Sequence, residues 1–194
     1  MDGFARRREQ KKKDILEAAL ALFMKYGVQK VSVAEIAKEA NVSQVTIYNY
    51  YESKDNLIQL VYQHYVDQIW EEMERLFTSD LPYEDKVKQM ISLKDVSNPT
   101  ISDVFYEDLV KDYGTGQSYV EEKYEKEGLP LLMEFVNEGK EQGYIDPALS
   151  NEAILVYLQM FQEYMRRDGV AQTLIPIAED LTKLFFYGIA GKKV

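Results

Sequence analysis

Several side chains with hydrogen-bonding groups lie close together between residues 43 and 54. Gln44 carries an amide that can pair with the edge of an adenine base. Thr46, Tyr48 and Tyr50 carry hydroxyls that can donate to phosphate oxygens. Lys54 adds a positive charge that attracts the same phosphates. These residue types predict a surface that binds nucleic acid, if the surrounding elements expose them together.

The elements predicted around these residues are two short helices joined by a tight turn. Ser32 and Glu35 form the Ser-x-x-Glu pattern of a capping box before the first helix. Asn41 ends that helix, because Asn tolerates the left-handed conformation that a sharp turn needs. Ser43 can cap the second helix, expected over residues 44–50. This is the geometry of a helix-turn-helix, whose second helix enters the major groove of DNA with its N-terminus first.

An amphipathic helix is predicted over residues 7–26, before the helix-turn-helix. Its apolar residues at helical spacing are Ile15, Leu16, Ala19, Leu22, Phe23 and Tyr26. Gly27 follows its end, where a left-handed residue is usual. Ala37 is small enough for the next two helices to approach closely, and Val42 and Ile47 supply their shared core. We expect Tyr51 to lie in the core as well, whereas Tyr48 and Tyr50 contact phosphate rather than core.

The charge of the chain is divided unequally along its length. The whole chain has a net charge of −10, which taken alone argues against DNA as a partner. Residues 1–54 nevertheless have a net charge of +3, and residues 55–194 have −13. We therefore predict two domains with these boundaries and with different functions. The basic residues before the helix-turn-helix are Arg6, Arg7, Arg8, Lys11, Lys12 and Lys13. An isolated basic run is usually a solvated tail, but this position favours DNA contact.

The composition argues against several other classes of protein. The chain has no cysteine, which excludes a disulfide scaffold, a thiolate metal site and cysteine catalysis. His64 is the only histidine, so we expect a core or pocket-edge side chain there and no metal site or histidine-based triad. We predict no enzyme activity and no cofactor. The longest apolar stretches fall short of the ~18 residues of a membrane span, and no secretory signal is expected, which favours the cytoplasm.

The remainder of the chain is predicted to be all helical, giving an all-α protein of about nine helices. Ser53 can cap a long helix that begins at Lys54. The expected helices are 54–77, 83–96, 100–112, 117–142 with an interruption near 128–130, 151–168 and 172–188. Neither strand alternation nor a repeat period is present.

Residues 15–65 resemble the DNA-binding domain of TetR-type transcriptional regulators. The matching stretches are Ile-Leu-Glu-Ala-Ala-Leu-Ala-Leu-Phe at 15–23, Tyr-Gly at 26–27, Val-Ala-Glu-Ile-Ala-Lys-Glu-Ala-Asn-Val-Ser-Gln-Val-Thr-Ile-Tyr-Asn-Tyr-Tyr at 33–51 and Ser-Lys-Asp-Asn-Leu at 53–57. The resemblance implies that Gln44 reads a base. The DNA-binding set that it implies is Ser43, Gln44, Val45, Thr46, Tyr48, Asn49, Tyr50 and Lys54. Ser43 caps its helix, binds phosphate, or does both.

Two residues depart from the pattern of the family. Asn41 replaces the usual glycine of the turn, which its tolerance of the left-handed conformation accommodates. Val45 stands where small residues or proline are common, and it can contact a thymine methyl group. These departures leave the sequence of the operator undetermined, but they do not change the prediction that the chain binds DNA.

In this family, a ligand-binding and dimerisation domain follows the DNA-binding domain. Large apolar and aromatic side chains here can line a pocket with a few hydroxyls, although ordinary core packing is the alternative for each of them. The predicted pocket residues are Trp70, Met73, Phe77, Phe105, Tyr106, Tyr113, Tyr124, Phe135, Tyr157 and Phe161. Acidic residues near the tyrosines raise the idea of a cationic ligand, but such charge more often forms a solvated face.

The last two predicted helices carry apolar stripes that can form a four-helix bundle with a second subunit, as the family does. The predicted interface residues are Leu155, Leu158, Met165, Ile177, Leu181, Leu184 and Phe185. The alternative is that both stripes pack within one subunit. A dimer also suits DNA reading, because two recognition helices read a palindrome in successive grooves.

The leading hypothesis is a homodimeric transcriptional regulator, a repressor released from a palindromic operator by a small molecule of unknown identity. The helix beginning at Lys54 would connect the DNA-binding domain to the pocket. The alternative is a DNA-binding architectural or cell-division factor of the same fold, without a small ligand. An enzyme on a helical scaffold is the third possibility, but the sequence offers no catalytic group.

Overall fold

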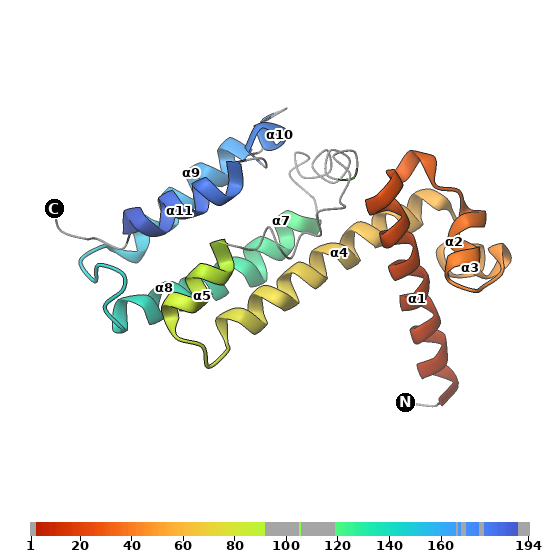
Figure 1. Cartoon of the computed structure of the whole chain (residues 1–194), viewed down its shortest axis with the longest axis horizontal. Coiled ribbons are helices and arrows are strands. Elements are labelled where there is room, and N and C mark those ends of the chain that lie inside the picture. Colours follow the sequence, from red (N-terminus) through yellow and green to blue (C-terminus); the bar gives the residue numbers. More distant parts are fainter. Residues whose placement is uncertain are drawn as a thin grey trace. The chain divides into compact units, whose positions relative to one another are not determined.

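The structure is a computed structural model that describes residues 3–91, 105, 119–165, 167, 170–174 and 177–189. Every regular element in these residues is helical, which confirms the all-α prediction (Figure 1). The chain divides into two compact units. The first contains residues up to 69 together with Phe105, and the second contains the other described residues.

The first unit contains three complete helices, one 3₁₀ turn and the beginning of a fourth helix. They are α1 (Gly3–Tyr26), η1 (Val28–Lys30), α2 (Val33–Glu39), α3 (Gln44–Tyr51) and the first part of α4 (Lys54–Phe77). The apolar side chains of these helices meet in one buried core. Its largest fully buried members include Ile15, Phe23, Ile36, Ile47 and Leu57. This core holds the predicted helix-turn-helix against α1, as the apolar spacing indicates.

The first unit extends beyond the predicted boundary at residue 54. Val61, Tyr62 and Tyr65 of α4 are buried in the same core as α1. Phe105 is fully buried there too, and its ring centroid lies 5.5 Å from Tyr62 and 5.4 Å from Tyr65. The prediction that Phe105 lines the ligand pocket is therefore wrong, because this side chain completes the core of the first unit.

The second unit contains the remaining helices. They are the end of α4, α5 (Tyr83–Ile91), α7 (Tyr119–Lys123), the π-helical segment η3 (Tyr124–Gly128), α8 (Leu129–Glu141), α9 (Asn151–Met165), α10 (Val170–Leu174) and α11 (Ala178–Ile189). Aromatic rings stack at its centre. The Phe135 ring lies 4.4 Å from the ring of Phe77 and 4.6 Å from that of Tyr83. Helices α9 and α11 lie side by side (Figure 1), and the rings of Tyr157 and Phe185 stack between them.

Most predicted helices are present, with some changed bounds. The long helix 54–77 is confirmed as α4. The first helix, predicted over residues 7–26, begins at Gly3 and so includes Arg6 together with the later basic residues. The predicted single helix 172–188 is wrong: α10 and α11 are separate helices. Proline lacks the amide hydrogen that a helix interior needs, and the sequence has Pro176 between them. The predicted helix 100–112 lies outside the described residues except for Phe105.

A buried ion pair connects three elements of the second unit. The Nζ atom of Lys86 on α5 donates to the carbonyl oxygen of Phe77, 2.9 Å away, at the end of α4. It also donates to both carboxylate oxygens of Glu138 on α8, at 3.0 and 3.1 Å. Lys86 is only 4% exposed, so these three acceptors replace the water that its ammonium group loses. The C-terminus of α4 is thereby held to α5 and α8.

Candidate DNA interface and apolar cavity

The turn between α2 and α3 follows the local signals of the sequence. The Ser32 amide donates to the Glu35 carboxylate at 2.7 Å, and the Glu35 amide donates to Ser32 Oγ at 3.2 Å. This is the predicted capping box. Its hydrogen bonds lower the pKa of Glu35, chiefly through the Ser32 hydroxyl. Asn41 has a φ of 52°, which confirms the predicted left-handed residue at the turn.

Helix α3 presents a mostly polar face to solvent along its length. Ser43 caps the helix, since its Oγ accepts from the Thr46 amide at 3.1 Å. The Thr46 hydroxyl forms a 2.8 Å hydrogen bond with the same Oγ. The side chains that stand exposed on α3 are Gln44, Val45, Tyr48 and Asn49. Val45 is 67% exposed although it is apolar, so the fold does not use it as a core residue.

The two tyrosines at the end of α3 have different environments. Tyr51 is buried, and its hydroxyl donates to the Lys12 carbonyl oxygen of α1 at 2.8 Å, so its predicted place in the core is confirmed. Burial raises the pKa of the Tyr51 hydroxyl well above its ordinary value. Tyr50 is half-buried, and the Arg8 guanidinium lies 5.8 Å from the centroid of its ring. Sequence spacing did not single out Arg8, because its neighbour is 42 positions away in the chain.

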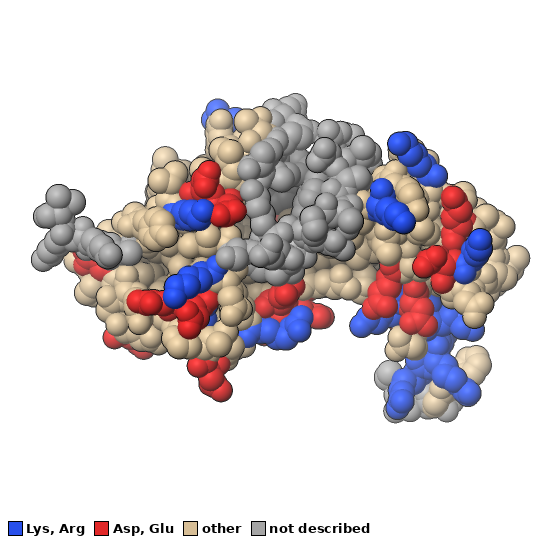
Figure 2. All heavy atoms as spheres, viewed as in Figure 1, with Lys and Arg blue, Asp and Glu red and all other residues tan. Residues whose placement is uncertain are grey.

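The basic N-terminal segment forms the first turns of α1, and Figure 2 shows its Lys and Arg side chains gathered there. Lys12 pairs with Glu9 at 3.1 Å, and Lys13 pairs with Glu17 at 3.7 Å. The Arg7 side chain donates to the Gly3 carbonyl oxygen. This basic segment, which we call the arm, therefore presents its cations on a helix, and that helix begins before the predicted start at residue 7.

Lys54 has a structural contact that its sequence position did not indicate. Its Nζ atom donates to the Val28 carbonyl oxygen at 3.3 Å, and the side chain is half-buried. An ammonium group has three donors, so this hydrogen bond leaves capacity for a phosphate. The phosphate role of Lys54 stays a prediction.

An apolar cavity of about 490 Å³ lies within the second unit. Six of the ten predicted pocket residues line it: Trp70, Met73, Phe77, Tyr124, Tyr157 and Phe161. Phe135 lies behind Phe77 in the core instead, and Tyr106 and Tyr113 lie outside the described residues. Sequence reasoning missed further lining residues, among them Met90, Leu132, Leu174, Thr182 and Phe186. These are ordinary helix residues, and only the packing of the helices brings them to one cavity.

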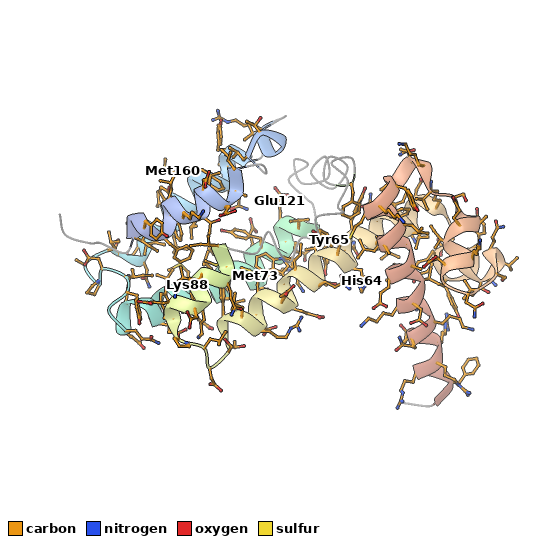
Figure 3. The ribbon with its side chains drawn as sticks, viewed as in Figure 1. His64, Tyr65, Met73, Lys88, Glu121 and Met160 are labelled. Atoms are coloured by element: carbon orange, nitrogen blue, oxygen red, sulfur yellow. The ribbon has the colours of Figure 1, made fainter. Side chains whose placement is uncertain are left out.

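Helices α9 and α11 expose large apolar side chains in the second unit. On α9 these are Val156, Tyr157, Met160, Phe161 and Tyr164, and on α11 they are Leu184 and Tyr187, with Ile177 just before it. We call this set the α9/α11 surface; Figure 3 labels Met160 within it. Among the predicted interface residues, Ile177 and Leu184 are exposed, and Leu155 and Phe185 are half-buried. Four of the predicted interface residues also line the cavity: Leu158, Leu181, Leu184 and Phe185. Nothing is described of the Met165 side chain.

His64 is half-buried on α4, where its Nε2 atom lies 3.1 Å from the Gln68 amide nitrogen. Figure 3 labels it on the same helix as Tyr65 and Met73. Within the described ranges, no group of three or more His, Asp or Glu side chains could hold a metal ion. No helix in that part of the chain is long and apolar enough to cross a membrane.

Comparison with known proteins supports the geometry of the first unit. Residues 15–61 match the model of the family described as bacterial regulatory proteins, tetR family. The transcriptional repressor KstR2 of Mycobacterium tuberculosis is 21% identical over 163 residues, covering 82% of this chain and 81% of the relative. The uncharacterized regulator YuxN of Bacillus subtilis is 41% identical over 59 residues, covering 30% of this chain and 20% of YuxN.

Solved structures show the same fold over nearly the whole chain. A TetR transcription regulator from Haloarcula marismortui has a TM-score of 0.64 at 15% identity, covering 93% of this chain and 98% of that one. The TetR regulator from Mycobacterium vanbaalenii has a TM-score of 0.63 at 16% identity, covering 96% and 98%. At these identities the likeness establishes the fold, and the function of individual residues must be argued from their chemistry.

Proposed function

We propose that this TetR-type helix-turn-helix transcriptional regulator is a homodimeric repressor that a small molecule releases from a palindromic operator. The observation that carries the proposal is the exposed face of α3. A helix cap and the core hold this helix in place, but the side chains of its exposed face do not pack in the core. We also propose that it acts in the cytoplasm, where it would meet this operator.

The proposed DNA contacts follow from which side chains of α3 are free to reach a groove. Gln44 stands exposed at the first position of the helix and would hydrogen-bond a base edge. Val45 would pack on a thymine methyl group. Tyr48 and Asn49 are exposed one turn later and would contact phosphates. The hydroxyls of Ser43 and Thr46 are hydrogen-bonded to one another, and their remaining hydrogen-bonding capacity can serve the sugar-phosphate backbone of DNA.

Arg8 and Tyr50 would form a second phosphate contact beside α3. The N–H donors of the Arg8 guanidinium point outward from the edge of its own plane. They can therefore bind a phosphate while the guanidinium lies over the Tyr50 ring. The Tyr50 ring lies edge-on to Tyr51, which is fixed in the core. The arm and α3 would therefore bind one stretch of duplex together.

The proposed dimer uses the α9/α11 surface. Met160 and Leu184 are each 67% exposed, and Tyr187 is 70% exposed. Large apolar side chains gathered on two neighbouring helices mark an association site. A two-helix face of this kind can pair with its own copy about a two-fold axis, and the palindromic operator reflects that symmetry.

The proposed effector site is the cavity of the second unit. Solved structures of similar fold include FadR of Bacillus subtilis in complex with stearoyl-CoA and RolR in complex with the ligand resorcinol. In this chain α4 continues from the helix-turn-helix core at Leu57 to the cavity wall at Phe77. A ligand that binds one of two α4 positions more tightly would shift the dimer toward a spacing that no longer fits the operator.

Selection from a random library of DNA duplexes tests the proposed reading of DNA. We expect the full chain to enrich a sequence with two-fold symmetry. Gln44→Ala should relax base preference at one position of each half-site, by about 1–3 kcal/mol of discrimination. Its affinity for random duplexes should change little. Enrichment of no sequence, or equal loss on selected and random duplexes, would contradict the proposal.

A further inference from the structure

The cavity of the second unit is lined without a single charged side chain among the described residues. Its polar groups are few, chiefly the hydroxyls of Tyr124, Tyr157 and Thr182. The Thr182 hydroxyl already donates to the Ala178 carbonyl oxygen at 2.8 Å. A charged ligand would lose part of its hydration against this apolar lining and would find no opposite charge among the described residues that form it. The lining therefore discriminates against ions of either sign.

The acidic residues of this region line a separate groove. Glu71, Glu74, Glu127 and Glu134 surround that groove with Lys123, and Trp70 borders both the groove and the cavity. Lys123 is paired with Glu127 at 2.8 Å. Among the described residues, the negative charge that could attract a cation is thus outside the apolar cavity, and they give the idea of a cationic ligand no support.

Two pairs of aromatic rings form parts of the cavity wall. The Trp70 ring lies 6.3 Å from the Tyr124 ring, with an angle of 46° between the planes. On α9 and α11, the rings of Tyr157 and Phe185 stack at 5.8 Å and 25°. Gly128 ends the π-helical segment η3, and a Cβ atom there would overlap the Trp70 ring. The missing side chain is therefore what lets Trp70 take its place in the wall.

We propose that this cavity binds an uncharged, mainly apolar molecule that contains a ring system. This inference rests on the proposed function only in taking the occupant to be the effector. The aromatic walls favour the faces and edges of a flat ring, and the hydroxyls can orient one or two polar groups on it. A volume of about 490 Å³ is within the range of about 300–1,000 Å³ found for small-molecule sites.

Fluorescence titration with three matched compounds tests the proposal, because Trp70 is the only tryptophan of the chain. The compounds are 1-naphthalenemethanol, 1-naphthoate and 1-naphthylmethylammonium, which share a ring and differ in charge. We expect the alcohol to quench Trp70 saturably and to bind at least about tenfold more tightly than either ion. A cation that binds as tightly as the alcohol would overturn the proposal, as would an alcohol that does not bind.

Variants locate the binding and test the role of charge. Gly128→Ala should weaken binding of the alcohol about fivefold or more, because the new methyl group displaces Trp70 into the cavity. Met73→Glu adds a carboxylate to the wall and should turn the preference toward the ammonium compound. Circular dichroism checks that each variant is folded. If both folded variants kept the wild-type preference, the ligand would lie elsewhere and the proposal would fail.

A groove variant and a DNA assay separate the alternatives. Glu74→Gln changes the acidic groove and should leave binding of the alcohol unchanged; a several-fold loss would place the alcohol in that groove and contradict the proposal. Duplex binding is measured on the same preparations. Intact DNA binding with no preference for the neutral compound would reject the ligand class alone, whereas absent DNA binding would reject the proposed function.

Discussion

The two units differ in the kind of surface that they offer to a partner. In the first unit, a small apolar core and two helix caps hold polar side chains of α3 in solvent. In the second, aromatic packing leaves an apolar cavity and large apolar side chains on the α9/α11 surface, and Tyr157, Phe161 and Leu184 belong to both. One unit is suited to a charged, hydrated partner, and the other to partners that exclude water. The excess of positive charge, +3 in residues 1–54 against −13 in residues 55–194, lies in the part of the first unit that contains α1, α2 and α3.

The largest effect is expected from a charge placed on the α9/α11 surface. Met160→Glu should prevent dimerisation and lower operator affinity by about 100-fold or more, because each monomer then reads one half-site. The matched control is Leu81→Glu, an exposed apolar residue outside that surface, which should remain dimeric. Sedimentation velocity and duplex binding measure both effects. A Met160→Glu variant that stays dimeric would show that the copies meet elsewhere.

The ion pair that ties α4 to α5 and α8 tests the second unit by itself. Lys86→Met should lower the free energy of unfolding by about 2–3 kcal/mol, because the Phe77 carbonyl and the Glu138 carboxylate lose their buried donor. Lys88→Met removes an exposed lysine of the same helix that pairs with Asp85, and should have little effect. Urea denaturation compares the two variants. Equal losses of unfolding free energy in the two variants would mean that the buried Lys86 ion pair stabilises the fold no more than the exposed Lys88 pair.

The capping box of α2 tests how the first unit presents α3. Ser32→Ala should lower the free energy of unfolding by about 1 kcal/mol at pH 7. Because the folded state lowers the pKa of Glu35 below its ordinary value of 4.5, the stability from its hydrogen bonds is present above that pH. It is lost as the pH falls through the lowered pKa. The difference between wild type and variant should therefore shrink below pH 4.5, and a difference independent of pH would argue against the Glu35 interaction.

The smallest expected effect concerns the arm. Arg8→Ala should weaken binding to all duplexes and reduce the slope of log K against log salt concentration by about one unit, because one phosphate contact is lost. Lys126→Ala removes a cation of the second unit that pairs with Glu122, and should leave the slope unchanged. Binding measured over a series of salt concentrations distinguishes them. An unchanged slope in the Arg8 variant would remove this residue from the DNA surface.

The sequence predicted the first unit well because its signals are local. Ser32, Asn41 and Ser43 act within three or four residues, so their roles could be read from spacing. The Arg8–Tyr50 contact and the Lys54–Val28 hydrogen bond join distant positions, and spacing does not reveal them.

The second unit was less predictable because its cavity depends on packing between helices. Trp70 and Phe161 line it as expected, but Phe105 fills the core of the first unit and Phe135 lies behind the wall. All four are large aromatic residues in helices, so their type does not show which of them face a cavity. Pro176 marks the separation of α10 from α11 in the sequence, but the prediction continued one helix across it.

The mass of the complex between the full chain and its selected duplex tests the central claim most directly. Sedimentation equilibrium at low salt should give two copies of the chain on one duplex, each on one half of a two-fold symmetric sequence. The same duplex with one half-site scrambled should bind much more weakly. A single copy per duplex, or equal affinity for intact and scrambled duplexes, would contradict a dimeric reader of a palindromic operator.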